Sequence, residues 1–218
     1  MEKILISPSI LSANYAELGK EINEIEKGGA DLIHCDVMDG VFVPNLNFGI
    51  KMTADIKKVF NIPLDVHLMI VEPERYIEDF AKAGSDIITI HYEAVKKPVI
   101  EVLKKIRSLG VKSGISIKPD TDVEVLKDLL PYVDLILIMC VYPGFGGQKY
   151  IEASTERIRK TRQLIREYNN DIMLEVDGGI TLENVKIVKE AGANVIVAGS
   201  SVFNYEDKKM AIDSLRNN

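Results

Sequence analysis

The stretch His34-Cys35-Asp36-Val37-Met38-Asp39-Gly40 places a histidine, a carboxylate and a thioether on alternate positions of one predicted β-strand. Side chains at positions i, i+2 and i+4 of a strand share a face. We therefore expect His34, Asp36 and Met38 to point into one space, and Cys35 and Val37 to point the other way.

Two later segments repeat this pattern. His67 and Met69 share a face in Asp65-Val66-His67-Leu68-Met69, and a further strand supplies Glu175-Val176-Asp177. Three strands therefore offer two imidazoles and two carboxylates to one site. Burying these groups together is costly unless they pair or bind a cation. Two nitrogen and two oxygen ligands suit zinc, ferrous iron, manganese or cobalt better than calcium or magnesium.

Apolar segments of strand length alternate with amphipathic segments of helix length along the chain, in eight pairs. The predicted strands are 4–10, 32–37, 64–69, 87–91, 112–117, 135–141, 173–176 and 195–198. The predicted helices are 15–27, 50–59, 73–82, 98–108, 123–130, 154–167, 182–190 and a last one from Asp207. A glycine stands where several helices end before a strand, as is typical of the left-handed helix C-terminus.

Continuous apolar strands joined by helices predict a parallel sheet covered by helices. Eight such units in 218 residues predict an α/β fold, a single-domain (β/α)8 TIM barrel over residues 1–218. An open doubly wound sheet is the alternative. The chemistry of such a barrel lies at the C-terminal strand ends. The residues at or near predicted strand ends are Ser9, His34, Asp36, His67, Met139 and Asp177.

Composition excludes several classes of function. The chain is 46% apolar and 28% charged with a formal charge of −6, which argues against a nucleic-acid or anionic-membrane partner. Its longest apolar run, 135–142, is far shorter than the ~20 residues that span a bilayer. The N-terminal residues lack a signal-peptide pattern and there are only two cysteines, so we expect a cytoplasmic protein.

Glycine-rich segments follow the last three predicted strands, at 141–148, 177–181 and 198–201. Glycine lets backbone N–H groups approach an anion closely, and loops after strands seven and eight of such barrels often bind phosphate. Three tight turns without a ligand are the alternative. The first segment is not a dinucleotide fingerprint, because Lys149 stands where the last glycine of that motif belongs.

Met38, Met69 and Met139 lie near strand ends in the same region. Methionines usually fill gaps in cores, but three beside a metal site favour a polarizable wall against a flat, electron-rich intermediate. His91 follows an apolar strand without a carboxylate neighbour on its face. We therefore expect His91 to be structural.

A phosphate site beside a metal site with two carboxylates indicates a small phosphorylated substrate. Carboxylates on opposite walls suit proton removal from one face of a carbon and return to the other, with the metal stabilising an ene-diolate. The pattern favours an isomerase or epimerase of a keto-sugar phosphate. An aldolase using Lys118, a metal-dependent hydrolase and a non-catalytic sugar-phosphate-binding barrel are the alternatives.

The sequence also resembles the ribulose-phosphate 3-epimerase family nearly from end to end. The matching motifs are SPSILS at 7–12, HCDVMDGVFVPN at 34–45, LDVHLM at 64–69, PGFGGQ at 143–148, VDGGI at 176–180 and Ala198 to Ser200. The resemblance implies a (β/α)8 barrel that interconverts D-ribulose 5-phosphate and D-xylulose 5-phosphate in the pentose phosphate pathway. It also implies a homo-oligomer.

The resemblance implies a role for each matching residue. Asp36 and Asp177 are the expected acid/base pair, and His34, Asp36, His67 and Asp177 the expected ligands of one divalent ion, with zinc or ferrous iron favoured over manganese or cobalt. The residues expected to contact the sugar are Ser9, His67, Met38, Met69 and Met139. Those expected to bind phosphate are Gly144, Phe145, Gly146, Gly147, Gly178, Gly179, Gly199 and Ser200, the first four in a mobile lid.

The sequence departs from the family pattern beside this lid. Cys140 stands where a serine or threonine is usual, and Tyr142 where a polar residue is usual. No expected ligand or base is lost. Because allulose-6-phosphate 3-epimerases share most of these motifs, D-allulose 6-phosphate is the alternative substrate.

Overall fold

Eight short apolar segments form parallel strands in the computed structural model, which describes residues 3–168 and 171–218. β-Branched and leucine side chains dominate them, as expected of strands buried on both faces. The strands are β1 (Leu5–Pro8), β2 (Ile33–Met38), β3 (Leu64–Met69), β4 (Ile87–His91), β5 (Lys112–Ile117), β6 (Leu135–Met139), β7 (Met173–Asp177) and β8 (Val195–Ala198).

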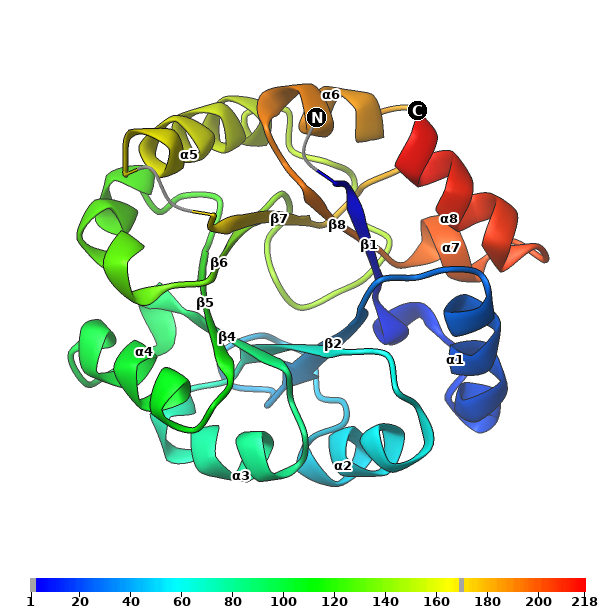
Figure 1. The fold of residues 1–218 in the computed structure, drawn as a ribbon, viewed down its shortest axis with the longest axis horizontal. Helices are drawn as coiled ribbons and strands as arrows, with labels where there is room; N and C mark the ends of the chain where they lie inside the picture. Colours follow the sequence, from blue (N-terminus) through cyan, green and yellow to red (C-terminus); the bar gives the residue numbers. More distant parts are fainter. Residues whose placement is uncertain (1–2, 169–170) are drawn as a thin grey trace.

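The strands form one eight-stranded parallel sheet in the order β1-β8-β7-β6-β5-β4-β3-β2. The two end strands meet through a single parallel bridge between Ser9 and His34. This bridge brings the residue that follows β1 beside β2, so the sheet curves into a nearly closed barrel (Figure 1). The TIM barrel expected from the eight repeats is therefore confirmed, and the open doubly wound sheet is wrong.

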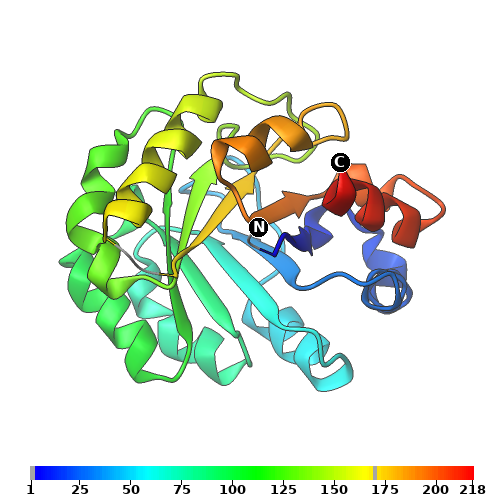
Figure 2. The ribbon, with the colours of Figure 1, turned by 45° about the horizontal axis from the view of Figure 1, so that its top comes forward.

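Helices surround the barrel on its outside, as both ribbon views show (Figures 1 and 2). They are α1 (Leu18–Lys27), α2 (Ile50–Val59), α3 (Ile77–Lys82), α4 (Val99–Ser108), α5 (Ser154–Tyr168), α6 (Val185–Ala191), α7 (Ser200–Phe203) and α8 (Lys208–Asn217). Short 3₁₀ turns precede or replace helices at η1 (Ile10–Ser12), η2 (Tyr15–Glu17), η3 (Pro73–Arg75), η4 (Tyr92–Ala94) and η5 (Val123–Tyr132).

The two faces of each strand lie in different surroundings. Cys35 and Val37 pack in the large apolar cluster between barrel and helices, whereas His34 and Asp36 on alternate positions of β2 belong to a buried polar set. Met38 packs with Met69 and Val43 in a separate cluster. The alternation expected for the opening stretch is thus confirmed.

Most predicted boundaries are close to the observed ones. β1 and β6 end at Pro8 and Met139, two residues before the predicted ends, because η1 begins at Ile10 after β1 and a loop follows β6. The helix predicted at 123–130 is a 3₁₀ helix that continues to Tyr132. The predicted domain limits, 1–218, include residues 1, 2, 169 and 170, which lie outside the described part of the chain.

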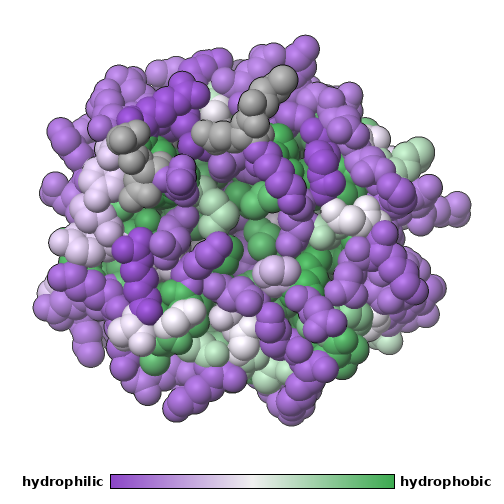
Figure 3. Space-filling view, viewed as in Figure 1, coloured by the Kyte–Doolittle hydropathy of each residue, from purple (hydrophilic) through white to green (hydrophobic). Residues whose placement is uncertain are grey.

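Hydrophilic side chains cover most of the rim of the barrel in the space-filling view, with apolar side chains showing between them (Figure 3). This distribution is ordinary for a folded domain, because a sphere has too little polar surface to be covered completely. Among the described residues, no helix combines the length and apolarity that crossing a membrane requires.

Candidate active site

Asp36 is the centre of a buried polar group at one end of the barrel. Its Oδ2 accepts a hydrogen bond from Ser9 Oγ at 2.6 Å, and its Oδ1 lies 3.0 Å from His67 Nδ1 and 3.3 Å from His34 Nε2. Asn47 holds the end of β2 in place, because its amide group donates to the Asp36 carbonyl and accepts from the Met38 N–H. Three strands therefore aim polar atoms at one carboxylate.

His34 is held from its other side by Asp65, whose Oδ2 lies 2.7 Å from His34 Nδ1. Glu175 Oε1 lies 3.7 Å from the same nitrogen, and Ser7 Oγ donates to Asp65 Oδ2 at 3.2 Å. All four side chains are fully buried. With Nδ1 engaged by a carboxylate, His34 has Nε2 free to face Asp36.

The donor set fits a divalent cation. One ligand atom each from His34, Asp36, His67 and Asp177 lies within 4.8 Å of the others. His34 Nε2 is buried and has no hydrogen-bond partner among the residues that the structure describes. Such an orphaned nitrogen beside two carboxylates is expected where an ion binds. A second group, His34, Asp65 and Glu175, meets the same distance criterion but lies entirely in the barrel interior.

The two carboxyl groups proposed as acid and base have opposite pKa shifts. Burial raises the pKa of Asp177 to about 6, and the negative charge of Asp36 adds to this effect. Burial also opposes ionisation of Asp36, but the charge of His34 and the close contacts with both imidazoles outweigh burial and lower the pKa of Asp36. Paired titratable groups whose pKa values are pushed apart are typical of acid/base catalysis.

His34 and Glu175, which lie behind Asp36, both have raised pKa values. Burial alone would lower the pKa of His34, but the charges and hydrogen bonds of Asp36 and Asp65 outweigh burial and raise it. Burial and the charge of Asp65 raise the pKa of Glu175. Of the two inner carboxyl groups, Asp65 is therefore the one that favours positive charge at His34.

His91, expected from the sequence to be structural, contacts two polar side chains of the site. Its Nε2 lies 2.9 Å from His67 Nε2, and its Nδ1 lies 3.2 Å from Glu93 Oε2. No carboxylate lies on the face of the strand that carries His91, but Glu93, beyond the strand end in η4, turns back toward the ring. Burial lowers the pKa of His91 to about 4.

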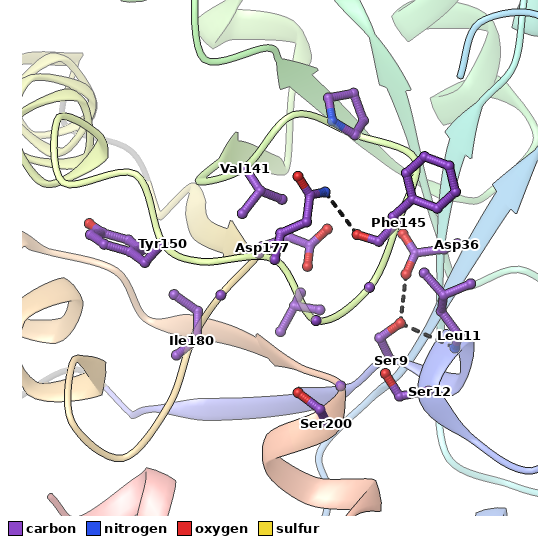
Figure 4. Close-up of a pocket in the computed structure, with 18 of the residues that line it drawn as sticks. Ser9, Leu11, Ser12, Asp36, Val141, Phe145, Tyr150, Asp177, Ile180 and Ser200 are labelled. Atoms are coloured by element: carbon purple, nitrogen blue, oxygen red, sulfur yellow. Dashed lines mark hydrogen bonds between the residues drawn. The ribbon is translucent and has the colours of Figure 1, made fainter. Parts of the chain in front are cut away.

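A cavity of ≈ 400 Å³ opens above the carboxylates. Figure 4 shows Asp36 from β2 and Asp177 from β7 facing it, with Phe145 of the β6–α5 loop close to Asp36. The predicted site residues that line this cavity are Ser9, Asp36, Met38, Met69, Met139, Gly144, Phe145, Gly146, Gly147, Asp177, Gly178, Gly179, Gly199 and Ser200. His34 and His67 are not among the lining residues, and both are fully buried behind Asp36.

Glycine is required on the rim of this cavity. Gly179 has φ +70°, and a Cβ there would collide with the backbone of Tyr150. A Cβ on Gly199 would collide with the Ser12 hydroxyl. The loop after β7 therefore packs directly against the backbone of the loop after β6, and the loop after β8 packs against the Ser12 side chain.

The β6–α5 loop is tied down on both sides. Asn45 Nδ2 donates to the Gly144 carbonyl at 2.8 Å, and Gln148 Nε2 donates to the Tyr142 and Phe145 carbonyls at 2.7 and 2.9 Å. Asn45 belongs to the loop after β2, so the loops on both sides of Asp36 are connected.

Known proteins match this chain over nearly its whole length. Residues 5–203 match the model of the ribulose-phosphate 3 epimerase family. The chain belongs to this family. A ribulose-phosphate 3-epimerase of Bacillus subtilis (strain 168) is 47% identical over 98% of both chains. One from Synechocystis is 50% identical over 99% of this chain and 94% of its own. Membership of the epimerase family makes this protein an isomerase.

Solved structures agree with the fold of this epimerase-family member. A 3-hexulose-6-phosphate synthase superposes with a TM-score of 0.68 at 17% identity, over 99% of this chain and 98% of its own. A protein titled KGPDC from Streptococcus mutans superposes with a TM-score of 0.75 at 11% identity, over 99% and 97%. At these identities the likeness concerns the barrel alone.

Cys140 and Tyr142, the departures from the family pattern beside the lid, lie outside the cavity of this epimerase. Cys140 is buried in the apolar cluster between barrel and helices, and Tyr142 is 56% exposed. Neither is a lining residue. Lys118, the candidate for aldol chemistry, has its Nζ 3.9 Å from the centre of the Phe42 ring and does not line the cavity either.

Three polar residues of this epimerase site were given no role in the sequence analysis: Asp65, Glu175 and Glu93. Asp65 and Glu175 stand two positions before His67 and Asp177, so strand alternation already puts each pair on one face. Glu93 stands two positions after His91 but beyond the strand end. Only the tertiary structure shows which imidazole each carboxylate contacts.

Proposed function

We propose that this chain interconverts D-ribulose 5-phosphate and D-xylulose 5-phosphate by moving a proton at carbon 3. The placement of Asp36 on β2 and Asp177 on β7, facing one cavity, carries the proposal. The names of relatives that are 47% and 50% identical support this substrate. A cavity of ≈ 400 Å³ is within the range of small-ligand sites.

Epimerisation inverts carbon 3, so the proton must leave one face of the substrate and return to the other. Asp36, with its lowered pKa, starts ionised and removes the proton, which leaves an ene-diolate. Asp177, whose pKa is raised to about 6, is protonated more readily than Asp36 and returns a proton to the opposite face. After one turnover the two groups hold the opposite protonation states, which are those needed for the reverse reaction.

One divalent cation held by His34, Asp36, His67 and Asp177 would supply positive charge to stabilise the ene-diolate oxygens. Zinc or ferrous iron suits two imidazoles and two carboxylates best, and manganese or cobalt is the alternative. Ser9 donates to Asp36 and holds that carboxylate in position beside the substrate. His67 would act on the substrate through Asp36 and the cation, because its ring does not line the cavity.

Other lining residues orient the sugar phosphate. Met38, Met69 and Met139 form an apolar wall of the cavity, which excludes water from the planar intermediate. The residues proposed to bind the phosphate through backbone N–H groups are Gly144, Phe145, Gly146, Gly147, Gly178, Gly179, Gly199 and Ser200. Their common position on the rim formed by the last three loops supports this role.

Solvent isotope incorporation tests the reaction. Because the proton removed and the proton returned sit on different carboxyl groups, product formed in D₂O should carry deuterium at carbon 3. A protein that converts neither ribulose 5-phosphate nor xylulose 5-phosphate with zinc, iron, manganese or cobalt supplied would contradict the proposal. Comparison with D-allulose 6-phosphate in the same assay decides between pentulose and hexulose substrates.

We propose in addition that the enzyme works as a homo-oligomer in the cytoplasm. Val41 and Leu46, in the loop after β2, are each 72% exposed, which supports an apolar contact with another copy. Both cysteines are free thiols, as expected in a reducing compartment. Light scattering of the purified protein gives the oligomeric state.

A further inference from the structure

The chain contains three histidines, and all three lie together in this site. His34, His67 and His91 stand on the neighbouring strands β2, β3 and β4, and each is fully buried. His67 and His91 contact each other through their Nε2 atoms at 2.9 Å, with ring centroids 5.0 Å apart. Two imidazole nitrogens at this distance share one hydrogen, so one ring donates and the other accepts.

Glu93 determines which ring donates. Its Oε2 lies 3.2 Å from His91 Nδ1, and an ionised carboxylate only accepts hydrogen bonds. His91 Nδ1 therefore carries the hydrogen, and in a neutral ring Nε2 then accepts. The hydrogen between the rings belongs to His67 Nε2. This leaves His67 Nδ1 with a lone pair directed at Asp36 Oδ1, 3.0 Å away.

The Glu93 carboxylate is held by the loop after β5. Its Oε1 accepts hydrogen bonds from the Lys118 backbone N–H at 2.8 Å and from the Thr121 hydroxyl. Burial disfavours ionisation of Glu93, but the hydrogen bonds from His91, Thr121 and Lys118 outweigh burial and lower its pKa to about 2. Glu93 is thus an ionised acceptor in a fixed orientation.

The same arrangement exists on the other side of Asp36. Asp65 accepts from His34 Nδ1, so the lone pair of His34 Nε2 also points toward Asp36 Oδ1, 3.3 Å away. Two imidazole lone pairs and a carboxylate oxygen repel one another at these distances, whereas a cation among them is attracted by all three. Each histidine has its own carboxylate to hold the orientation that a cation needs.

We propose that Glu93 and His91 are positioning residues that hold His67 as its Nε2–H tautomer, with Nδ1 available to a divalent cation. This inference rests on the metal site of the proposed function. Carboxylate partners of ligating histidines act in this way in other metal sites. Here the carboxylate would act through a second imidazole instead of directly.

Replacing Glu93 by glutamine tests the direction of the hydrogen bonds that run from Glu93 through His91 to His67. If the glutamine oxygen keeps the Lys118 N–H, its NH₂ group faces His91 Nδ1 and donates to it. His91 Nε2 would then carry the hydrogen, His67 Nε2 would accept, and His67 Nδ1 would be protonated. If the amide flips, the Lys118 N–H loses its acceptor. The arrangement that keeps the Lys118 hydrogen bond is therefore favoured, and it opposes metal binding although the side-chain volume is unchanged.

We expect Glu93→Gln to weaken zinc affinity about 10- to 100-fold, measured by competition with a chromogenic chelator. Glu124→Gln is the matched control, because it makes the same substitution at an exposed carboxyl group of η5 that has no contact with this site. Its zinc affinity should equal that of the original protein. Melting temperatures of the metal-free proteins separate a loss of fold from a loss of metal binding.

Zinc affinity unchanged in Glu93→Gln, or weakened equally in Glu124→Gln, would overturn the inference while leaving the metal site in place. Failure of the original protein to bind zinc, iron, manganese or cobalt would overturn the metal site itself, and the inference with it. These results are distinguishable because neither measurement depends on epimerase turnover.

Imidazole nitrogen NMR of the zinc-loaded original protein gives a second test that needs no variant. With three histidines in the chain, the ring signals are few enough to assign. The inference requires His91 to be the Nδ1–H tautomer. A spectrum that shows the Nε2–H tautomer for His91 would overturn it.

Discussion

Asp65 Oδ2 lies 2.7 Å from His34 Nδ1, and both side chains are fully buried. This contact fixes the orientation of the His34 ring, because the ring nitrogen on the far side then faces Asp36. The residues of β2 and β3 pair His34 with Asp65 in register, so the contact follows from the sheet itself. Asp65, which lies inside the barrel, thus supports a histidine that would bind the metal.

Asp65→Asn should weaken binding of a divalent ion about 10- to 100-fold, because the amide is a poorer acceptor for His34 Nδ1–H than the carboxylate. Isothermal titration with zinc measures the change. Ser7→Ala is the control, because the Ser7 hydroxyl donates to the same Asp65 oxygen. The substitution removes this donor and leaves the carboxylate that faces His34. Equal zinc affinity in Asp65→Asn and the original protein would contradict this role.

Asp36→Asn and Asp177→Asn should each lower the rate of epimerisation by at least about 100-fold, because an amide cannot remove or return the proton. Steady-state rates in both directions, with metal supplied in excess, check this. Asp128→Asn changes an exposed carboxyl on η5 and should leave the rate unchanged. A barrel that only binds sugar phosphates predicts no turnover in any of the four proteins.

Gly114→Ala should destabilise the barrel by about 1–3 kcal/mol, because a Cβ there would collide with the Thr89 side chain in the paired strand β4. Gly19→Ala, in helix α1, is the opposite case. A Cβ on Gly19 meets no atom within 4 Å, and we expect a gain of up to about 1 kcal/mol. Urea unfolding of the metal-free proteins measures both, and equal stabilities would refute the packing argument.

Cys35 and Cys140 should resist thiol reagents in the folded protein at about pH 8, because the thiolate is the reactive form. Burial raises the pKa of Cys140 to about 12, with a contribution from the charge of Asp177, and burial raises the pKa of Cys35 as well. A raised pKa keeps each thiol protonated until the pH is far above neutral. Colorimetric titration should find both thiols only after denaturation, and rapid labelling of the native protein would be inconsistent with this burial.

Local patterns in the sequence were sufficient for the fold and for the positions of most candidate site residues. Alternation along β2 placed His34 and Asp36 on the inner face, and eight repeats of strand and helix indicated the barrel. The barrel in turn predicted that Asp177 and the glycine loops would lie at the same end. Their common position around one cavity agrees with this expectation.

The positions of Glu93 and His91 illustrate what local patterns leave open. His91 ends β4 and Glu93 lies in the turn after it, where strand alternation no longer applies. Whether the carboxylate turns toward the ring depends on the loop after β5, which anchors Glu93 through Lys118 and Thr121.

The sequence by itself therefore determined the barrel, its family and the inner-face residues Asp36 and Asp177, because these follow from short-range periodicity and contiguous motifs. Only the tertiary structure decided which carboxylate supports which imidazole, and that the two expected histidine ligands lie behind Asp36 instead of lining the cavity. Register between strands and the path of the connecting loops set these contacts, and both depend on packing between segments that are distant in the chain.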